Sequence, residues 1–252
     1  RSENHADAVV SSILGATSYG NYEIILVHNG DLTNQQIEKL QTSSKVKLVK
    51  YDYSEFSLAK KINFGCEAAD GDYFVLMNDD IRVRTSDWIE RMLGMAQRPG
   101  VGAVGAKLLF PDDTIQHAGV VLLPGGPGHP YYGQPSTIHG YGLGAAVDRN
   151  YSAVTGACKM ISRSVFFKLG GYSEKYPLNY NDVDFCLRAH DVGLRTVYLG
   201  GVVMYHYEGV SKDGGKSVAD EELDVFRADW DHRLRDDPYY NANLPKNRPY
   251  GT

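Results

Sequence analysis

Three adjacent polar residues, Asn78, Asp79 and Asp80, follow the most apolar short stretch of the chain, residues 72–77. Neighbouring carboxylates repel one another unless a positive group holds them, and a hard divalent cation with oxygen ligands can do so. Asn and Asp are also common in ordinary turns. The motif alone therefore favours a metal site and a polar turn about equally.

A second polar group consists of Asn181 and the two acidic residues Asp182 and Asp184. Acidic side chains in a first helical turn complement the helix dipole, and this structural explanation is the commoner one for such a pair. A carboxylate in a cleft can also remove a proton from a hydroxyl, as a general base does. Asp182 and Asp184 lie two positions apart and so do not share a helix face.

His206 follows the apolar run 202–205, which places it at the expected end of a strand. An isolated histidine usually has a structural role, and His28 and His117 carry the same expectation. If Asp80 lies beside His206, however, the pair of imidazole and carboxylate suits manganese or a similar metal.

The first 100 residues alternate between helical and strand-like segments. The spacing predicts helices over 5–16, 33–42, 57–69 and 86–96, and strands over 23–28, 46–50 and 72–77. Such alternation predicts a parallel sheet covered on both faces. Ligands of these sheets bind outside the carboxyl ends of the strands, where residues 29–30 and 78–80 would lie.

The second half has a different pattern. Strand-like runs are expected within 101–123 and 151–162 and over 195–199 and 202–207, with helices over 164–169, from residue 181 and over 220–235. Residues 124–150 are rich in Gly, Pro and Tyr and form a long excursion, expected to select the acceptor. Residues 209–217 are the candidate for a mobile lid.

Composition excludes several classes of function. Net charge is -5, from 26 Lys+Arg and 31 Asp+Glu, which argues against a nucleic-acid binder. The three cysteines, Cys66, Cys158 and Cys186, are far apart and predict buried thiols in a reduced compartment. No apolar run reaches the roughly 18 residues of a membrane span, so we expect no transmembrane segment and a cytoplasmic location, peripheral at the inner membrane face. The sequence has no GxGxxG, P-loop, GxSxG or HExxH motif.

Taken together, the sequence resembles the inverting family 2 glycosyltransferases of the GT-A fold, especially their bacterial rhamnosyltransferase-like branch. The similarity rests on segments that cover most of the chain, among them NYEIILVHNG (21–30), GDYFVLMNDDIRV (71–83), VGAVGAKLLFPDDTIQHAGVVL (101–122), RNYSAVTGACKMISRSVF (149–166), NDVDFCLRAHDVGLRTVYL (181–199) and YHYEG (205–209). The resemblance implies an α/β fold with a Rossmann-like, mostly parallel central sheet, helices on both faces and a small acceptor-side subregion. It also implies a nucleotide-sugar-binding half (1–100), an acceptor-binding and catalytic half of the same domain (101–219) and a C-terminal helix and tail (220–252).

The resemblance assigns a role to each candidate residue. Asp80 and His206 would bind a divalent metal, Mn²⁺ or Mg²⁺, and Asp182 would be the general base. Asn181 and Asp184 would contact the acceptor. The residues implied in donor binding are His28, Asn29, Asn63, Asn78, Asp79, Thr155 and Gly156.

The implied reaction is a single displacement at the anomeric carbon of a dTDP-, UDP- or GDP-linked sugar, with inversion. Asp182 would take the proton of the acceptor hydroxyl while the metal stabilises the departing diphosphate. The acceptor would be a glycan or a lipid-linked sugar of cell-surface polysaccharide synthesis.

Two features depart from the family pattern. His28 stands where relatives usually carry Asp, which leaves the choice of nucleotide open. Relatives also begin with an apolar strand ahead of the first helix, and this first strand is expected to be missing here, weakening stability and donor binding. An alternative is therefore a non-catalytic or impaired module that binds a sugar nucleotide or glycan. A third interpretation, a sugar-nucleotide pyrophosphorylase, would need a Gly-rich phosphate loop near the start, which the sequence lacks.

Overall fold

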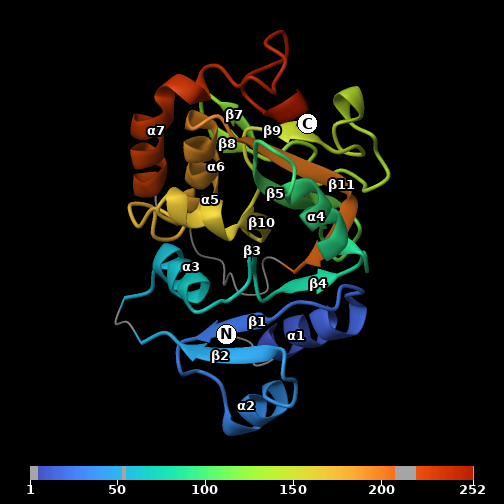
Figure 1. The fold of residues 1–252 in the computed structure, drawn as a ribbon. Coiled ribbons are helices and arrows are strands. Elements are labelled where there is room, and N and C mark those ends of the chain that lie inside the picture. The colour runs from blue at the N-terminus through green and yellow to red at the C-terminus, as the bar shows by residue number, and fades with distance from the viewer. Residues whose placement is uncertain (1–4, 53–54, 208–219, 252) are drawn as a thin grey trace.

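The computed structural model describes residues 5–52, 55–207 and 220–251 (Figure 1). The helices are α1 (His5–Ala16), α2 (Asn34–Leu40), α3 (Leu58–Glu67), α4 (Trp88–Ala96), α5 (Arg163–Lys168), α6 (Asn181–Asp191) and α7 (Asp220–Leu234), with short 3₁₀ turns η1 (Tyr141–Leu143) and η2 (Pro249–Gly251). The strands are β1 (Ile24–His28), β2 (Val46–Lys50), β3 (Tyr73–Met77), β4 (Ile81–Val83), β5 (Val101–Leu109), β6 (Ile115–His117), β7 (Val121–Leu123), β8 (Gly126–Gly128), β9 (Arg149–Tyr151), β10 (Cys158–Ser162) and β11 (Arg195–His206).

The main sheet has seven strands, with the path β3-β10-β5-β11-β4 and with β6 and β9 paired to β5 and β11. The long pairing of β5 with β11 is parallel, as is that of β1 with β2 in a separate two-stranded sheet. The pairings of β10, β4, β6 and β9 are antiparallel. Strands from both predicted halves therefore share one sheet, and the predicted α/β class is confirmed.

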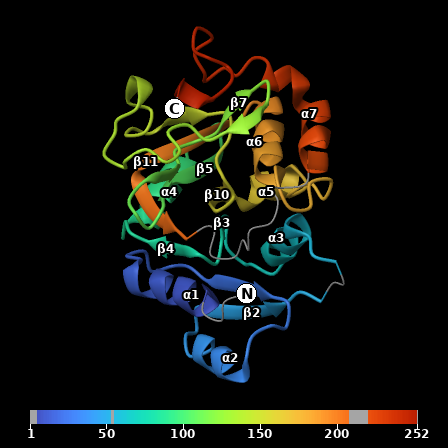
Figure 2. The same ribbon diagram turned by 180° about the vertical axis from the view of Figure 1, so that it is seen from behind.

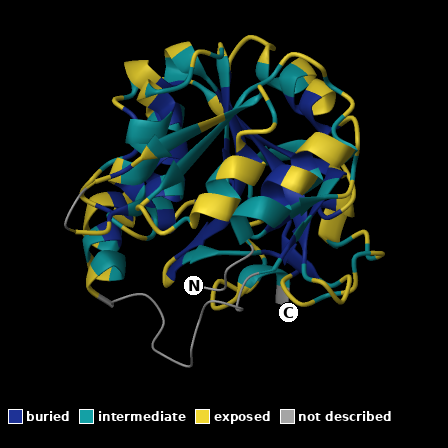
Figure 3. Ribbon diagram, turned by 90° about the horizontal axis from the view of Figure 1, so that it is seen from below, coloured by how far each residue is buried: buried dark blue, intermediate teal, exposed yellow. Residues whose placement is uncertain are grey.

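Side chains of β5 alternate between two apolar layers because successive residues of a strand point to opposite faces. Val104, Ala106 and Leu108 pack with Trp88 and Met92 of α4. Ala103 and Leu109 belong to the layer on the other face, which includes the buried side chains of α5, α6 and α7. Figure 2 shows these three helices grouped on one side of the molecule, and Figure 3 shows the buried residues concentrated in the central strands. Helices thus cover both faces, as predicted.

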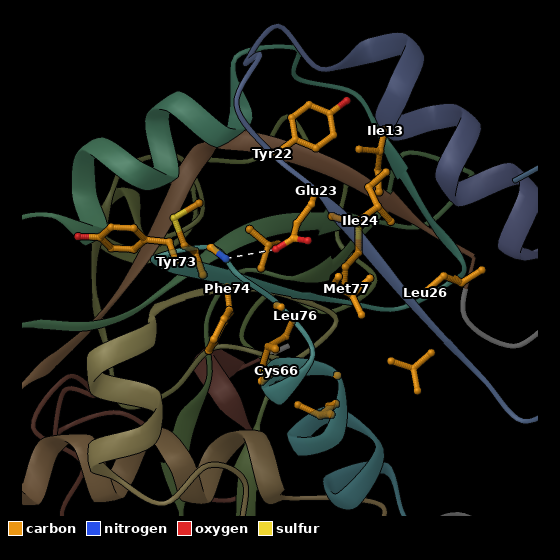
Figure 4. A pocket seen from close by; sticks show the side chains of 18 of the residues that line it. Ile13, Tyr22, Glu23, Ile24, Leu26, Cys66, Tyr73, Phe74, Leu76 and Met77 are labelled. Carbon is orange, nitrogen blue, oxygen red and sulfur yellow. Dashed lines mark hydrogen bonds between the residues drawn. The ribbon is translucent and has the colours of Figure 1, made fainter. Parts of the chain in front are cut away.

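A cavity of about 1010 Å³ separates the β1–β2 pair from the main sheet. Its lining comes from α1, β1, α3, β3 and α4 and is mainly apolar, with Ile24, Leu26, Phe74 and Leu76 among its side chains (Figure 4). Within the described ranges, β1 pairs with β2 alone and β3 with β10 alone. Each of these two strands therefore has one edge without a strand partner, and both strands line the cavity. The missing first strand stays a prediction.

Most predicted elements occur within two or three residues of their expected bounds, including 5–16 and 46–50, which match α1 and β2. One prediction was wrong in detail. The runs 195–199 and 202–207 form a single strand, β11, whose register against β5 shifts between Leu199 and Val203. Gly200 and Gly201 mark this irregularity and do not end the strand, since the backbone pairs on both sides of them. The predicted lid, 209–217, lies outside the described residues.

The three cysteines are buried free thiols, as expected from their spacing. Burial raises the pKa of the Cys66 and Cys158 thiols to about 12, so both are protonated at neutral pH. Among the helices that the structure describes, none has the length and apolar character needed to span a bilayer.

Candidate active site

The turn after β3 and the end of β11 bring the first candidate residues together. Ile81 pairs with His206 in the antiparallel β4–β11 ladder, which places Asp80 beside the imidazole. Asp80 Oδ1 lies 3.0 Å from His206 Nε2, and Asn78 Nδ2 lies 3.3 Å from the same nitrogen. The juxtaposition of Asp80 and His206, residues from distant parts of the sequence, follows from strand pairing.

The surroundings of this pair favour an ionised carboxylate. Burial by itself would raise the pKa of Asp80, but the hydrogen bond and the positive field of His206 outweigh it, so the pKa is lowered. His206 is 4% exposed, and its Nδ1 atom is buried with no hydrogen-bond partner among the described residues. The Asp80 carboxylate and the His206 Nε2 atom that faces it fit part of a manganese-type donor set.

The described residues gather no group of three or more His, Cys, Asp and Glu that could hold a metal ion. Asp80 and His206 would thus supply two ligands, and a bound cation would need further oxygen ligands from elsewhere. Diphosphate oxygens are suited to that part, since Mg²⁺ and related cations are commonly held by one or two side chains together with substrate phosphates.

Asp182 lies in the first turn of α6, with its carboxylate held by two backbone amides. Gly156 N donates to Oδ2 at 2.7 Å, and Val183 N donates to Oδ1 at 2.8 Å. Asn78 N donates to the carbonyl oxygen of Ala157 at 3.1 Å. The turn that contains Gly156 therefore links Asp182 to the Asn78–Asp80 segment.

Lys159, the second residue of β10, is completely buried and contacts Asp182. Its Nζ donates to the Asp182 carbonyl oxygen at 2.8 Å and to Cys186 Sγ at 3.6 Å. The ammonium also lies 5.2 Å from the ring centre of Tyr172, a distance at which ring and cation attract. Lys159 thus fixes the first turn of α6 from inside the protein.

The donor-side candidates His28, Asn29 and Asn63 have local or structural partners. His28 Nδ1 accepts from Gly30 N at 3.1 Å, and Asn29 Oδ1 accepts from Lys61 Nζ at 2.8 Å. The Asn63 side chain bonds to both backbone groups of Tyr172, donating to its oxygen at 2.9 Å and accepting from its nitrogen at 2.8 Å. Asn63 therefore holds the loop before α6, and donor binding by these three residues stays a prediction.

The acceptor-side candidates Asn181 and Asp184 are 3% and 4% exposed. Asn181 Nδ2 donates to the carbonyl oxygen of Tyr176 at 3.1 Å. Asp184 accepts from Arg188 Nε at 2.7 Å and from Trp230 Nε1 at 3.2 Å. Burial raises the pKa of Asp184 although Arg188 opposes this. Both side chains are engaged in the core, and their acceptor role stays a prediction.

Sequence reasoning missed Lys159 and the partner of His117. Lys159 left one signal, a charged residue inside the apolar strand segment CKMIS. His117 was expected to be structural, and it is 0% exposed with both ring nitrogens in contact with polar groups. Its partner His129 lies in the 124–150 excursion and left no signal, because their proximity depends on how that excursion folds back.

The sequence model of the family described as "Glycosyl transferase family 2" matches residues 2–170. An uncharacterized protein, y4gI, of Sinorhizobium fredii (strain NBRC 101917 / NGR234) is 37% identical over 252 residues, covering 96% of this chain and 28% of the relative. The O-antigen biosynthesis protein RfbC of Myxococcus xanthus is 34% identical over 246 residues, covering 94% of this chain and 19% of RfbC. The chain thus spans less than a third of either relative.

Among solved structures, GalNAc-T7 with UDP, GalNAc and Mn²⁺ superposes with a TM-score of 0.69 at 15% sequence identity. The superposition covers 87% of this chain and 44% of GalNAc-T7. At this level of identity the similarity shows a shared fold.

Proposed function

Because this chain belongs to glycosyl transferase family 2 and has the GT-A fold, we propose that it transfers a sugar from a nucleotide diphosphate to an acceptor hydroxyl, with inversion at the anomeric carbon. The observation that carries the proposal is the Asp182 carboxylate, oriented by two backbone amides beside the Asn78–Asp80 turn. A base on one side and a segment that can bind a cation for the diphosphate on the other are the two parts that a displacement of diphosphate requires.

Asp182 acts as the general base. The amides of Gly156 and Val183 fix both carboxylate oxygens, and Lys159 fixes the backbone of the same residue. A base held in one orientation can accept the acceptor's proton as the hydroxyl oxygen attacks the anomeric carbon. The remaining lone pairs of the carboxylate are available for that proton.

Asp80 and His206 hold the divalent cation, Mn²⁺ or Mg²⁺. When bound, this cation supplies positive charge that stabilises the diphosphate leaving group. Asn78 and Asp79, in the same turn, would contact the donor's ribose or sugar. The solved structure of GalNAc-T7 holds both UDP and Mn²⁺, which supports this placement by analogy of fold.

The donor is a dTDP-, UDP- or GDP-linked sugar, hexose or rhamnose, and the acceptor is a glycan or a lipid-linked sugar. The similarity to the O-antigen biosynthesis protein RfbC supports a role in cell-surface polysaccharide synthesis. A lipid-linked acceptor would bring the chain to the inner face of a membrane.

A second candidate function is binding of a sugar nucleotide or glycan without turnover. The cavity between β1 and β3 favours it, because Asn78 and Asp79 follow a strand with one unpaired edge and also line that cavity. A donor site on such a strand would be less rigid than catalysis demands.

The test separates binding from transfer. Calorimetric titration with UDP, dTDP and GDP, with and without Mn²⁺, should show one nucleotide whose binding requires the metal. Asp80→Asn should abolish the metal-dependent binding, whereas the matched control Asp112→Asn, in an exposed turn, should bind as the wild type does.

Asp182→Asn should keep nucleotide binding and lose transfer. NMR of the anomeric signal of the wild type's product should show inversion. Unchanged metal-dependent binding in Asp80→Asn would refute the metal site. Metal-dependent binding with no transfer to any glycan acceptor would favour the second candidate.

A further inference from the structure

A buried pair of histidines lies behind the turn that holds Asp182. His117, the last residue of β6, is 0% exposed, and its Nδ1 lies 3.0 Å from Nδ1 of His129. The two rings are 5.1 Å apart and steeply inclined, at 74°. Two nitrogens this close share a hydrogen bond, so one must donate and the other accept.

The contacts of His117 decide which nitrogen carries the proton. Its Nε2 lies 3.3 Å from the amide of Gly119 and 3.4 Å from the amide of Thr155, both of which donate. A nitrogen that accepts N–H bonds carries no proton, so the proton of neutral His117 is on Nδ1. His117 therefore donates to His129, whose own proton is on Nε2.

The environment keeps His117 neutral. Burial lowers its pKa well below the ordinary range, and the positive charge of Lys159 acts in the same direction. The ring is thus held in one tautomer, with both nitrogens occupied and no exposed surface. It is not placed to touch a substrate.

The Thr155 amide is where the histidine pair meets the candidate active site. The next amide along the chain, of Gly156, donates to Asp182 Oδ2 at 2.7 Å. Thr155 Oγ1 accepts from the amide of Ala157 at 3.3 Å, which closes the turn on its other side. The turn has little room to shift, since a Cβ on Gly156 would lie 3.2 Å from Asp182 Cβ and from Tyr172 Oη.

We propose that His117, oriented by His129, is a positioning residue that holds the Thr155–Gly156 turn in the conformation in which Gly156 N–H fixes the Asp182 carboxylate. The inference rests on the proposed function of Asp182 and adds to it a specific requirement. Residue 117 must present a hydrogen-bond acceptor at the Nε2 position, which His117 does because its proton is held on Nδ1.

Two substitutions separate the two nitrogens. His117→Gln places an amide oxygen near the Nε2 position and can still accept from Gly119 and Thr155. His117→Asn places its amide near the Nδ1 position, so it can still meet His129 but cannot reach the turn. The two variants are therefore a matched pair of similar polarity.

The measurements are amide hydrogen exchange at Thr155 and Gly156, followed by NMR, and steady-state sugar transfer. We expect His117→Asn to speed exchange at both amides and to lower kcat about 10- to 100-fold, with KM for the nucleotide sugar within about threefold. His117→Gln should restore slow exchange and bring kcat to within about threefold of the wild type.

His129→Phe is the second variant, for the case that His117→Asn does not fold. It leaves His117 in place but removes its acceptor, so exchange at Thr155 should quicken and kcat should fall by a smaller factor. Unchanged exchange and kcat in folded His117→Asn or His129→Phe would overturn the inference. So would an equal loss of kcat in the Gln and Asn variants with both amides still protected.

Failure of the proposed function gives a different result. A wild-type chain that binds nucleotide but transfers no sugar overturns the catalytic proposal. Exchange at Thr155 and Gly156 still reports on the positioning contact, because it needs no turnover. If the wild type transfers sugar and His117→Asn transfers it equally fast, only the positioning inference is overturned.

Discussion

The cavity between β1 and β3 predicts that one added strand would stabilise the protein. A five-residue strand is about 17 Å long, and with spacings of about 4.8 Å between strands and about 10 Å between layers it occupies roughly 800 Å³. The cavity measures about 1010 Å³ and has an apolar lining. The perturbation is fusion of the segment Val-Ile-Val-Ile-Val ahead of residue 1, leaving residues 1–4 to join it to α1.

The expected gain in the free energy of unfolding is the sum of three contributions. They are burial of apolar side chains, formation of backbone hydrogen bonds and the entropy cost of ordering the added residues. Five buried apolar side chains contribute about 10 kcal/mol, and ordering five residues costs about as much, at about 2 kcal/mol each. About ten new backbone hydrogen bonds at the lower end of their net worth, about 0.5 kcal/mol, then leave a gain of about 5 kcal/mol. For a chain of this size that gain raises the melting temperature by about 10–20 °C.

Hydrogen exchange identifies the edges that the added strand would occupy. Ile24 N donates to Lys45 O on the β2 side, so by alternation the amides of Ile25 and Val27 point toward the cavity edge. Asn78 N donates to Ala157 O beyond β10, which by the same alternation directs the amides of Val75 and Met77 to the open edge of β3. These four amides should become protected when the strand is added.

The control is Val-Ile-Pro-Ile-Val, which keeps the apolar content but loses an amide donor and cannot sit centrally in a sheet. Its melting temperature, measured by differential scanning fluorimetry, should rise by less than about a third as much. Size-exclusion chromatography should show that both fusions are monodisperse. Equal melting temperatures for the fused and original chains, with exchange at Ile25 and Val75 unchanged, would refute the reasoning.

Three further outcomes are expected. Gly156→Ala should lower kcat about tenfold or more, because the new Cβ would meet Asp182 Cβ and Tyr172 Oη at 3.2 Å and shift the base. Asp184→Asn should cost about 2 kcal/mol of unfolding free energy through its bond with Arg188, while nucleotide binding stays unchanged. Burial lowers the pKa of His190 from 6.5 to about 4, so its contribution to stability is complete above pH 6.5 and is lost as the pH falls toward 4. His190→Phe should therefore remove about 2–3 kcal/mol of the acid destabilisation between pH 7 and 4.5.

Two of these have a matched control. Gly94→Ala, in an exposed part of α4 with open space around its Cα, should leave kcat unchanged. His232 is an exposed histidine of α7. In urea unfolding, His232→Gln should lose as much free energy of unfolding between pH 7 and 4.5 as the wild type does. Loss of nucleotide binding in Asp184→Asn would contradict the structural role of Asp184. If His190→Phe lost as much unfolding free energy on acidification as the wild type does, the lowered pKa of the buried His190 would be contradicted.

The local elements of the fold could be predicted from the sequence because their signals are local. Strands β1 and β3 are short apolar runs that end at polar turn residues, and α1 shows helical spacing up to Ala16. The position of Asn78–Asp80 at a strand end follows from the same signals. Where the chain remains extended through glycines, as at Gly200 and Gly201 of β11, local signals mislead, because pairing with β5 continues on both sides.

The sequence by itself thus determined the order of elements, the fold class and the strand-end placement of the acidic residues, since periodicity and turn chemistry act between near neighbours. Only the tertiary structure decided which of these groups meet. Asp80 meets His206 through the β4–β11 ladder, His117 meets His129 inside the fold, and Asp184 turns toward Trp230 in the core and not toward the surface. The physical reason is that such contacts join residues far apart in the chain, and packing, not local propensity, selects them.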